Sequence, residues 1–323
     1  MRKFLLIIAV FTVYSSTTSG QGDFDLSQRW FNEAIYNPAA TGNTYSMGVF
    51  MHARRQWFGI SRAPKTGAIS ADMFIPAIRS GVGLSVTADK IGFTSSYNAR
   101  LAYAYYIPLN SKSSLSLGLS ASLLCWDHNI SSANITDPND PLLAVGNRTD
   151  YNPDFDFGVE YQGLFKFGAS VRHLLKVKST SYRVGYSRNI WAYASTRLNL
   201  SSAVSIEPTA SFTYHDDVSR YEAGGIFYFG KTEAKHKYND KFWVGAMYRF
   251  NSQYAILAGM HATKRIRIGY SFDYSVGSSR HLSKAGTHEL FVAWHLNRSF
   301  YKNNELCPAY SKTTRDKRGY LKR

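Results

Sequence analysis

Clustered carboxylates are the residues of this chain whose types and spacing would suit chemistry. Asp154, Asp156 and Glu160 follow one another closely, and Asp72 and Asp89 form a second, looser set. Paired carboxylates act as general acid and base in hydrolases, and several carboxylate oxygens together bind Ca²⁺. Catalysis and cation binding are therefore the two chemical functions to weigh against a structural role.

A structural role is the simpler interpretation of these carboxylates. They fall on the polar side of alternating runs, where Arg54 and Arg100 on neighbouring strands offer partners for ladders of opposite charge. A hydrolase would need a nucleophile and a base within reach on one strand face, and no nucleophile-elbow sequence is present. We expect no catalytic residues and no enzyme activity.

Two short motifs resemble metal sites without meeting their requirements. The sequence DPNDP at 137–141 offers oxygen ligands but lacks the glycine and the spaced acids of a calcium loop. The sequence THEL at 287–290 has no second histidine at zinc spacing and falls in an alternating run. We expect neither a metal ion nor a cofactor.

The elements that carry these residues are strands, because period-2 alternation recurs almost from end to end. The chain is predicted to be all-β, with about 14 strands of the length that a tilted membrane strand needs. The predicted strands span 44–57, 66–75, 81–89, 97–107, 113–124, 154–162, 164–172, 189–199, 203–215, 220–230, 241–250, 253–262, 264–274 and 287–297.

The strand lengths and the placement of aromatic residues favour a transmembrane antiparallel β-barrel over a soluble sandwich. Aromatic rings recur at strand ends on the apolar side, which is typical of the bilayer interface. These residues are Trp57, Tyr97, Tyr105, Phe155, Tyr161, Tyr214, Tyr221, Phe229, Phe242, Phe250 and Tyr274. The apolar face then meets lipid, and the polar face lines the lumen.

The polar face carries charges of both signs, which lipid would not tolerate. They are Arg54, Asp72, Asp89, Arg100, Asp154, Asp156, Glu160, Lys166, Arg172, Arg197, Glu207, Glu222, Arg249, Arg265, Arg267, Asp273 and Glu289. Because the signs are mixed, we favour ion pairing that fills the lumen over an open permeation path.

The first residues and the charge balance indicate an exported protein. Arg2 and Lys3 precede an apolar run and a small polar stretch, which is the pattern of a cleavable signal peptide over 1–20. The formal charge of +16 is concentrated partly in the tail 298–323, and export argues against nucleic acid as its partner. Two distant cysteines in 323 residues exclude a disulfide scaffold.

The predicted connections alternate between short and long. Longer ones are expected at 58–64, 90–96, 126–153, 173–188 and 275–286, while the charged stretch 231–240 breaks the rule on the short side. In outer-membrane barrels the short turns and, with an even strand number, both termini are periplasmic. The basic tail would then be periplasmic.

The strand over 44–57 shows how one run would serve both faces of the wall. Its residues from 45 to 51 supply a lipid-facing stripe. Arg54 and Gln56 are predicted to point inward, toward Asp72 on the next strand, while Arg55 and Trp57 mark the outer rim.

Several segments together resemble the PorP/SprF outer-membrane proteins of the type IX secretion system of Bacteroidetes. They are YNPAATG at 36–42, RRQWFGISRAPKT at 54–66, GVGLSVTADKIGFTSSYNARLAYAYYIPL at 81–109, FGASVRHLL at 167–175, IGYSFDYSVG at 268–277 and GTHEL at 286–290. The resemblance covers nearly all of the mature chain. It implies a non-enzymatic barrel that exports or attaches cargo bearing a sorting domain and contacts periplasmic secretion subunits, in a system linked to gliding motility.

The turn at Asn37, Pro38 and Ala39 is also similar to that of FadL-type barrels, in which an N-terminal segment occupies the lumen. The resemblance implies that these residues form a lumenal hatch. The expected organisation is a signal peptide over 1–20, a lumenal segment over 21–43, an outer-membrane barrel over 44–297 and a basic periplasmic tail over 298–323.

The leading functional hypothesis is an accessory or anchoring subunit of type IX secretion in the bacterial outer membrane. Its partners would be membrane lipid, periplasmic secretion subunits, and secreted or surface-attached cargo that meets the loops 126–153 and 173–188. The alternative, suggested by the FadL-like turn, is a transporter for a hydrophobic small molecule. A lateral gap and an apolar lumenal pocket would favour that alternative.

Overall fold

The computed structural model describes residues 23–43, 47–110, 113–129, 146–176, 185–233, 237–276, 280 and 285–296. Side chains are described for these residues except 231–233, 237–239 and 296. The predicted signal peptide 1–20, the basic tail 298–323, DPNDP at 137–141, and most of the predicted loop 126–153 lie outside the described residues.

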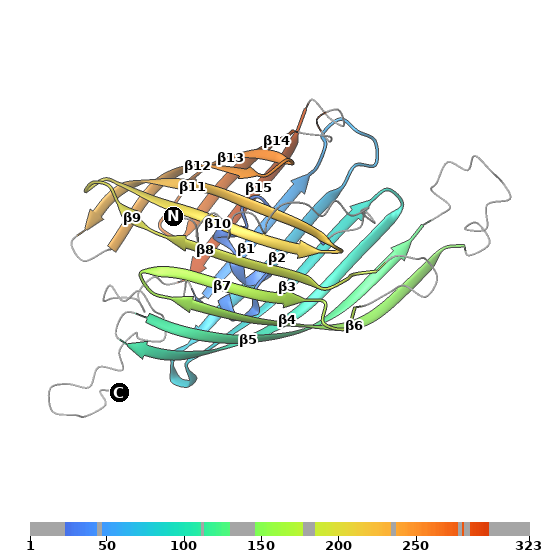
Figure 1. Cartoon of the computed structure of the whole chain (residues 1–323), viewed down its shortest axis with the longest axis horizontal. Helices are drawn as coiled ribbons and strands as arrows, with labels where there is room; N and C mark the ends of the chain where they lie inside the picture. The colour runs from blue at the N-terminus through green and yellow to red at the C-terminus, as the bar shows by residue number, and fades with distance from the viewer. Residues whose placement is uncertain are drawn as a thin grey trace, which may run out of the picture.

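Antiparallel strands form the wall of the molecule and surround the N-terminal segment, drawn in blue in Figure 1. The strands are β1 (Met47–Arg55), β2 (Lys65–Ile75), β3 (Ser80–Ile91), β4 (Thr94–Asn110), β5 (Ser113–His128), β6 (Arg148–Gln162), β7 (Phe165–Arg172), β8 (Asn189–Thr196), β9 (Leu198–Asn199), β10 (Val204–His215), β11 (Val218–Glu233), β12 (Lys237–Arg249), β13 (Gln253–His261), β14 (Ile266–Ser275) and β15 (Thr287–Leu296).

Each strand pairs with its sequence neighbours, and β1 closes the sheet by pairing with β15. The two-residue β9 continues the line of β8 along β10, so β8 and β9 together count as one strand of the barrel. The structure is thus a closed barrel of fourteen antiparallel strands, with β8 and β9 counted as one, as the alternation predicted. Closure leaves no edge strand at the seam between first and last strand.

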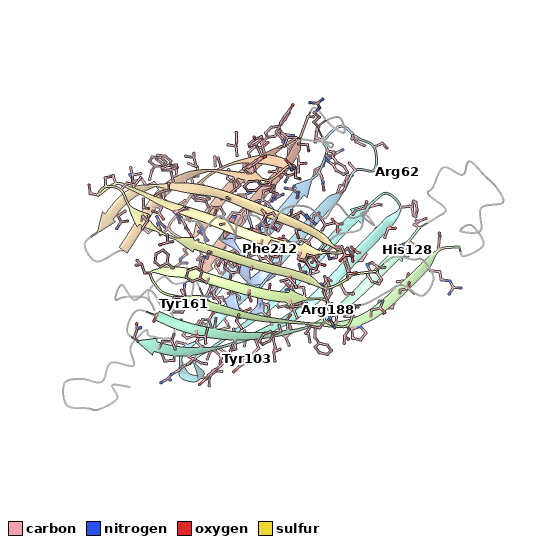
Figure 2. All side chains as sticks on the ribbon, in the orientation of Figure 1. Arg62, Tyr103, His128, Tyr161, Arg188 and Phe212 are labelled. Carbon is pink, nitrogen blue, oxygen red and sulfur yellow. The ribbon has the colours of Figure 1, made fainter. Side chains whose placement is uncertain are left out.

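The alternation within β5 explains why such sequences form a wall with two different faces. Ser116 and Ser120 are buried on the inner face, while Leu117 and Leu119 are exposed on the outer face. Large apolar side chains are exposed in this way on most strands, and Figure 2 shows side chains such as Tyr103 and Tyr161 on the outside of the wall. An exposed apolar belt on a closed barrel is the surface that lipid covers.

Two predicted connections were wrong. The predicted long connection at 90–96 is a two-residue turn between β3 and β4, in which Gly92 has a φ of +62° that suits glycine. The charged stretch 231–240 continues the β11–β12 hairpin, with Lys231 opposite Asn239, so it does not break the short-turn rule.

The two ends of the barrel differ in their connections. The connections that follow β2, β4, β6, β9, β11 and β13 share one end, which is also where β1 begins and β15 ends. The longer connections at 56–64, 129–147, 173–188 and 276–286 share the other end with the tight turns 92–93, 216–217 and 250–252. Among the described residues, no helix is long and apolar enough to cross a membrane.

Candidate functional site

The N-terminal segment, residues 23–43, lies inside the barrel and is almost entirely buried. It has no strand-like alternation and instead forms three short 3₁₀ helices, η1 (Arg29–Phe31), η2 (Glu33–Ile35) and η3 (Pro38–Ala40). Asn37 begins η3 by accepting a hydrogen bond at 3.0 Å from the backbone N–H of Ala39. Proline at the first position of η3 suits such a start, because its missing N–H would have no helical partner there.

The first anchor of the segment is a charged group on β1, β14 and β15. Arg54 lies 2.7 Å from Asp273 and 3.1 Å from Glu289, and it also donates to the Ser27 hydroxyl at 3.0 Å. Glu289 in turn accepts the backbone N–H groups of Ser27 at 2.7 Å and Gln28 at 3.1 Å. One buried carboxylate therefore joins the wall cation to the backbone of the segment.

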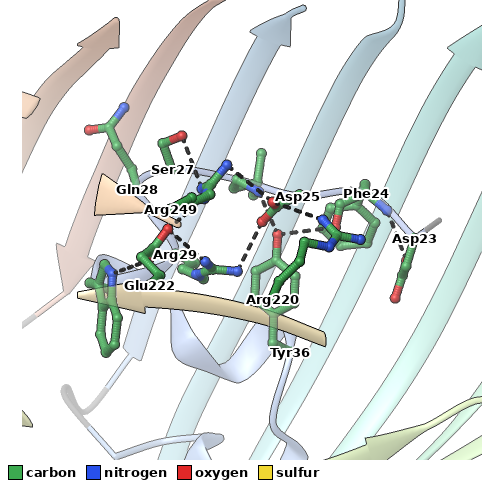
Figure 3. A network of polar contacts seen from close by, with 12 residues as sticks. Asp23, Phe24, Asp25, Ser27, Gln28, Arg29, Tyr36, Arg220, Glu222 and Arg249 are labelled. Carbon is green, nitrogen blue, oxygen red and sulfur yellow. Dashed lines mark hydrogen bonds and ion pairs between the residues drawn. The ribbon is translucent and has the colours of Figure 1, made fainter. Parts of the chain in front are cut away.

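The second anchor centres on Asp25 and Arg29 of the segment (Figure 3). Asp25 lies 3.1 Å from Arg249, and Arg29 lies 2.9 Å from both Asp25 and Glu222. Trp30 adds a hydrogen bond from its indole N–H to Glu222 at 3.2 Å. Charges of the segment thus alternate with charges of β11 and β12, so each buried ion has a partner of opposite sign.

The third anchor holds Asp23 beside β7. Asp23 pairs with Arg172, and its carboxylate lies 3.2 Å from His173 Nε2. His173 Nδ1 lies 2.6 Å from Asp154, and the backbone N–H of His173 donates to Asp156 at 3.1 Å. This chain of contacts ties the beginning of the described segment to β6 and β7.

Asp154, Asp156 and His173 also have the geometry of a metal site, since one ligand atom of each lies within 4.8 Å of the others. Asp156 already accepts a hydrogen bond from Ser120 at 2.8 Å and lies 3.4 Å from Arg100. A cation would have to displace these partners and approach a guanidinium. We interpret the cluster as a hydrogen-bonded anchor, which is the structural role that the sequence favoured.

The electrostatics of the segment keep Asp23 and Asp25 ionised. Burial by itself would raise the pKa of Asp25, but Arg249 and Arg29 more than offset burial and hold the pKa below its usual range. Burial likewise opposes ionisation of Asp23, and Arg172 and His173 hold its pKa below the usual range. The ion pairs of the second anchor, around Asp25, and of the third anchor, around Asp23, are therefore present at neutral pH.

Three glycines let the segment lie directly against the wall. A Cβ atom on Gly158 would lie 1.9 Å from Asn37 Oδ1, one on Gly118 would lie 2.1 Å from the backbone nitrogen of Ala39, and one on Gly81 would lie 1.8 Å from the carbonyl oxygen of Thr41. Contacts of that length do not occur between unbonded heavy atoms. The wall strands β3, β5 and β6 are therefore shaped to receive residues 37–41.

Aromatic side chains fill the space between these polar anchors. Trp30 contacts Trp191 and Tyr193, and Phe31 stacks on Phe291 at a centroid distance of 5.6 Å. The resulting buried cluster combines residues of the segment with inward residues of the wall. Aromatic packing and buried ion pairs together exclude water from much of the lumen.

A pocket beside the segment is small and partly charged. An interior pocket of about 30 Å³ lies between the first residues of the segment and the wall, with Asp23, Arg172, Glu222 and Arg249 among its lining residues. That volume accommodates about one or two water molecules.

Four of the predicted site residues contact or belong to the N-terminal segment near its end. Asn37, Pro38 and Ala39 are buried in the lumen, where Asn37 donates to Val159 O and to Tyr193 Oη, each at 3.1 Å. Arg100 is also buried, and it donates to the carbonyl oxygen of Ile35. These residues all contact or belong to the N-terminal segment.

The predicted interaction of Arg54 with Asp72 was wrong. Arg54 does point inward, but it lies opposite Thr66 on β2, while Asp72 lies opposite Gly48. Six positions along a strand correspond to about 20 Å, so the two side chains cannot meet. Asp72 instead accepts the backbone N–H of Gly42 at 2.5 Å.

Gln56, Trp57, Asp89 and Arg265 also differ from expectation in detail. Gln56 and Trp57 lie beyond the end of β1 in the 56–64 connection, so Gln56 does not line the lumen as part of a strand. Asp89 faces inward but accepts the Thr66 hydroxyl at 2.5 Å, far from Asp72, so the two do not form a carboxylate pair. Arg265 is exposed in the 262–265 turn and not in the lumen.

The sequence analysis did not identify the charged residues of the segment itself. Asp23, Asp25, Arg29 and Glu33 each pair with the wall, Glu33 through Lys166 at 2.5 Å. The available signal was a stretch dense in charged and aromatic residues, with no alternation, directly before the first strand. Such a stretch is too polar for lipid and too apolar for a solvated linker.

The fold and the filled lumen define the class of protein: a closed outer-membrane β-barrel whose own N-terminal segment occupies its interior. A family model described as "Type IX secretion system membrane protein PorP/SprF" matches residues 18–294. The chain belongs to this family, which confirms the resemblance drawn from the sequence. Membership implies contact with the membrane and with the secretion machinery, and it points to a secretion component, not an enzyme.

Comparison with curated proteins found no match. Among solved structures, the chain is similar to the outer membrane protein Omp33 of Acinetobacter baumannii, at 14% identity over 78% of this chain and 98% of that chain, with a TM-score of 0.43. It is also similar to the toluene transporter TbuX of Ralstonia pickettii, at 11% identity over 80% of this chain and 90% of that chain, with a TM-score of 0.45. A FadL homologue of Pseudomonas aeruginosa matches at 12% identity over 82% of this chain and 94% of that chain, with a TM-score of 0.44. Likeness at this level carries no argument about function.

Proposed function

We propose that this protein is an accessory or anchoring subunit of type IX secretion that serves export or surface attachment of cargo proteins with a sorting domain. The observation that carries the proposal is the filled lumen. Arg54, Glu289, Asp25 and Arg249 join the N-terminal segment to the wall by buried ion pairs, which suits a barrel that works through its surfaces.

A filled lumen counts against the alternative, a transporter for a hydrophobic small molecule. Such a transporter needs an apolar pocket within the wall, because apolar ligands bind where apolar side chains replace water. The pocket beside the segment is lined by both charged and aromatic residues, and its volume of about 30 Å³ is too small for such a ligand. We propose that Asn37, Pro38 and Ala39 act as a hatch that keeps this interior closed.

The proposed orientation follows from the unequal ends of the barrel. Short turns mark the periplasmic end of outer-membrane barrels, so both termini of the barrel would be periplasmic. The connections within 126–153 and 173–188 would then meet cargo at the cell surface. The basic tail 298–323 would meet periplasmic subunits, and its excess of lysine and arginine suits an acidic partner.

The proposal is tested by deleting the gene and measuring the surface proteome. We expect at least one protein with a sorting domain to be lost from the surface and to accumulate in the periplasm, with recovery when the wild-type gene is restored. Unchanged export of all such proteins would overturn the proposal.

Two further complementing genes separate the roles of the two ends. Replacing 130–145 by a short flexible linker is expected to abolish cargo display without changing barrel assembly. Removing 298–323 is expected to abolish co-purification with periplasmic secretion subunits. Full cargo display and unchanged co-purification in these strains would contradict the assigned roles.

A further inference from the structure

Three basic side chains form a row across the outer face of β1, β2 and β3, which are neighbours in the wall (Figure 1). In the register of these strands Arg55 lies directly opposite Lys65, and Lys65 lies directly opposite Lys90. All three residues are exposed, and the row lies where β1 ends and β2 begins. Like charges directly opposite one another across strands are destabilising, so the row calls for an anionic partner.

The protein itself does not supply that partner within the described residues. The outward positions of β14, β15 and β1 to β4 contain no aspartate or glutamate. Asp89 and Glu289 are among the residues that line the adjoining groove, but both occupy inward positions of the wall. Asp89 accepts the Thr66 hydroxyl there, and Glu289 pairs with Arg54. The contact made by Arg55 is with the ring of Phe58, at 4.8 Å, which does not neutralise its charge.

A groove adjoins the basic row on the side toward the middle of the wall. The next residues in register are small, with Ala53 opposite Gly67 and Gly67 opposite Ala88. Tyr97 stands beside Ala88, and Tyr270 borders the other side, so the small residues form the floor of a groove of about 690 Å³. Further along the strands the outer face continues with large apolar residues such as Ile69 and Val86.

We propose that this groove binds a phosphorylated lipid, with phosphate on Arg55, Lys65 and Lys90 and an acyl chain over Gly67. The row spans two inter-strand spacings, about 10 Å, so more than one phosphate oxygen is within reach of the three cations. The groove opens onto the lipid-facing wall, which favours a lipid over an acidic protein segment. Given the proposed orientation, the lipid belongs to the outer leaflet.

The full-length protein in detergent, with lipid A added, provides the test by native mass spectrometry. Replacing Arg55, Lys65 and Lys90 by glutamine is expected to weaken binding by roughly fivefold for each cation removed. Gly67→Leu fills the groove, keeps all three cations, and is also expected to weaken binding. Arg148→Gln, an exposed cation at the same end of the barrel on β6, is the matched control and should bind as the wild type does.

Three results would overturn the proposal. Equal binding by wild type and Lys65→Gln would show that the row does not bind the phosphate, and equal binding by Gly67→Leu would show that no chain lies in the groove. Complete competition by inorganic phosphate at equal concentration would assign the row to free phosphate. If the triple variant does not fold, the single Lys65→Gln and Gly67→Leu variants decide. Because binding is measured on purified protein, its failure is distinct from failure of secretion in cells.

Discussion

Arg54 is the residue on which the first anchor depends, because it neutralises two buried carboxylates. Arg54→Met would leave Asp273 and Glu289 buried without their main partner. Removing one member of a buried ion pair costs about 3–5 kcal/mol of unfolding free energy. We expect this loss in thermal or denaturant unfolding of the purified barrel.

The adjacent Arg55 provides the matched control for that substitution. Its side chain is exposed on the outer face, so Arg55→Met is expected to change the unfolding free energy by no more than about 0.5 kcal/mol. Equal effects of the two substitutions would contradict the structural role of Arg54.

Gly158 is the residue at which the segment lies closest to β6. Gly158→Ala would place a methyl carbon 1.9 Å from Asn37 Oδ1, so residues 37–41 are expected to leave the wall. A thiol introduced by Ala40→Cys, at a position buried in the wild type, reports this movement once Cys125 and Cys307 are replaced by serine. We expect its labelling by a small polar reagent to accelerate at least about tenfold.

Gly225→Ala is the control for Gly158→Ala, because its new methyl carbon would have no neighbour closer than 3.8 Å. Labelling of the introduced thiol should be unchanged in that variant. If Gly158→Ala also left labelling unchanged, residues 37–41 would not be held against β6 as described.

The sequence was sufficient to predict which face of a strand a residue occupies but not which residue it contacts. The inward position of Arg54 followed from alternation alone. Its partner Glu289 lies directly opposite it on β15, the last strand, and only closure of the barrel brings β1 and β15 together. The sequence around Arg54 does not show whether its partner lies on β15 or on β2. This is why the pairing with Asp72 on β2 was predicted incorrectly.

At the scale of elements, the strands were predictable because each alternates over enough residues to define two faces. The N-terminal segment was less predictable. Its location in the lumen was inferred from resemblance, while its charged contacts were not predicted. Residues 23–35 have no period, and their charged partners lie on β7, β11, β12 and β15. Contacts so distant in sequence leave no local pattern.

The turns at the two ends of the barrel allow the proposed orientation to be tested. A peptide tag inserted between Gly92 and Phe93 lies at the end opposite the termini, and a tag within 200–203 lies at the same end as the termini. We expect an antibody to bind the first tag on intact cells and the second only after permeabilisation. The reverse result would show that the termini face the cell surface.

At the scale of the whole molecule, the barrel combines a lipid-facing exterior with a lumen filled by ion pairs and aromatic rings. The sheet closes through β1 and β15, and inward residues of the wall contact the segment at both the polar anchors and the aromatic cluster. Such an interior resists water, so the molecule presents its two ends and its outer wall to other components. This is the physical basis for proposing a secretion subunit and not a transporter.

Ion conductance in planar lipid bilayers tests this central claim most directly. The wild-type protein is predicted to give no stable conductance steps, and a variant lacking residues 23–43 is predicted to conduct, because the wall alone encloses a polar channel. Wild-type conductance equal to that of the deletion variant would contradict a filled lumen.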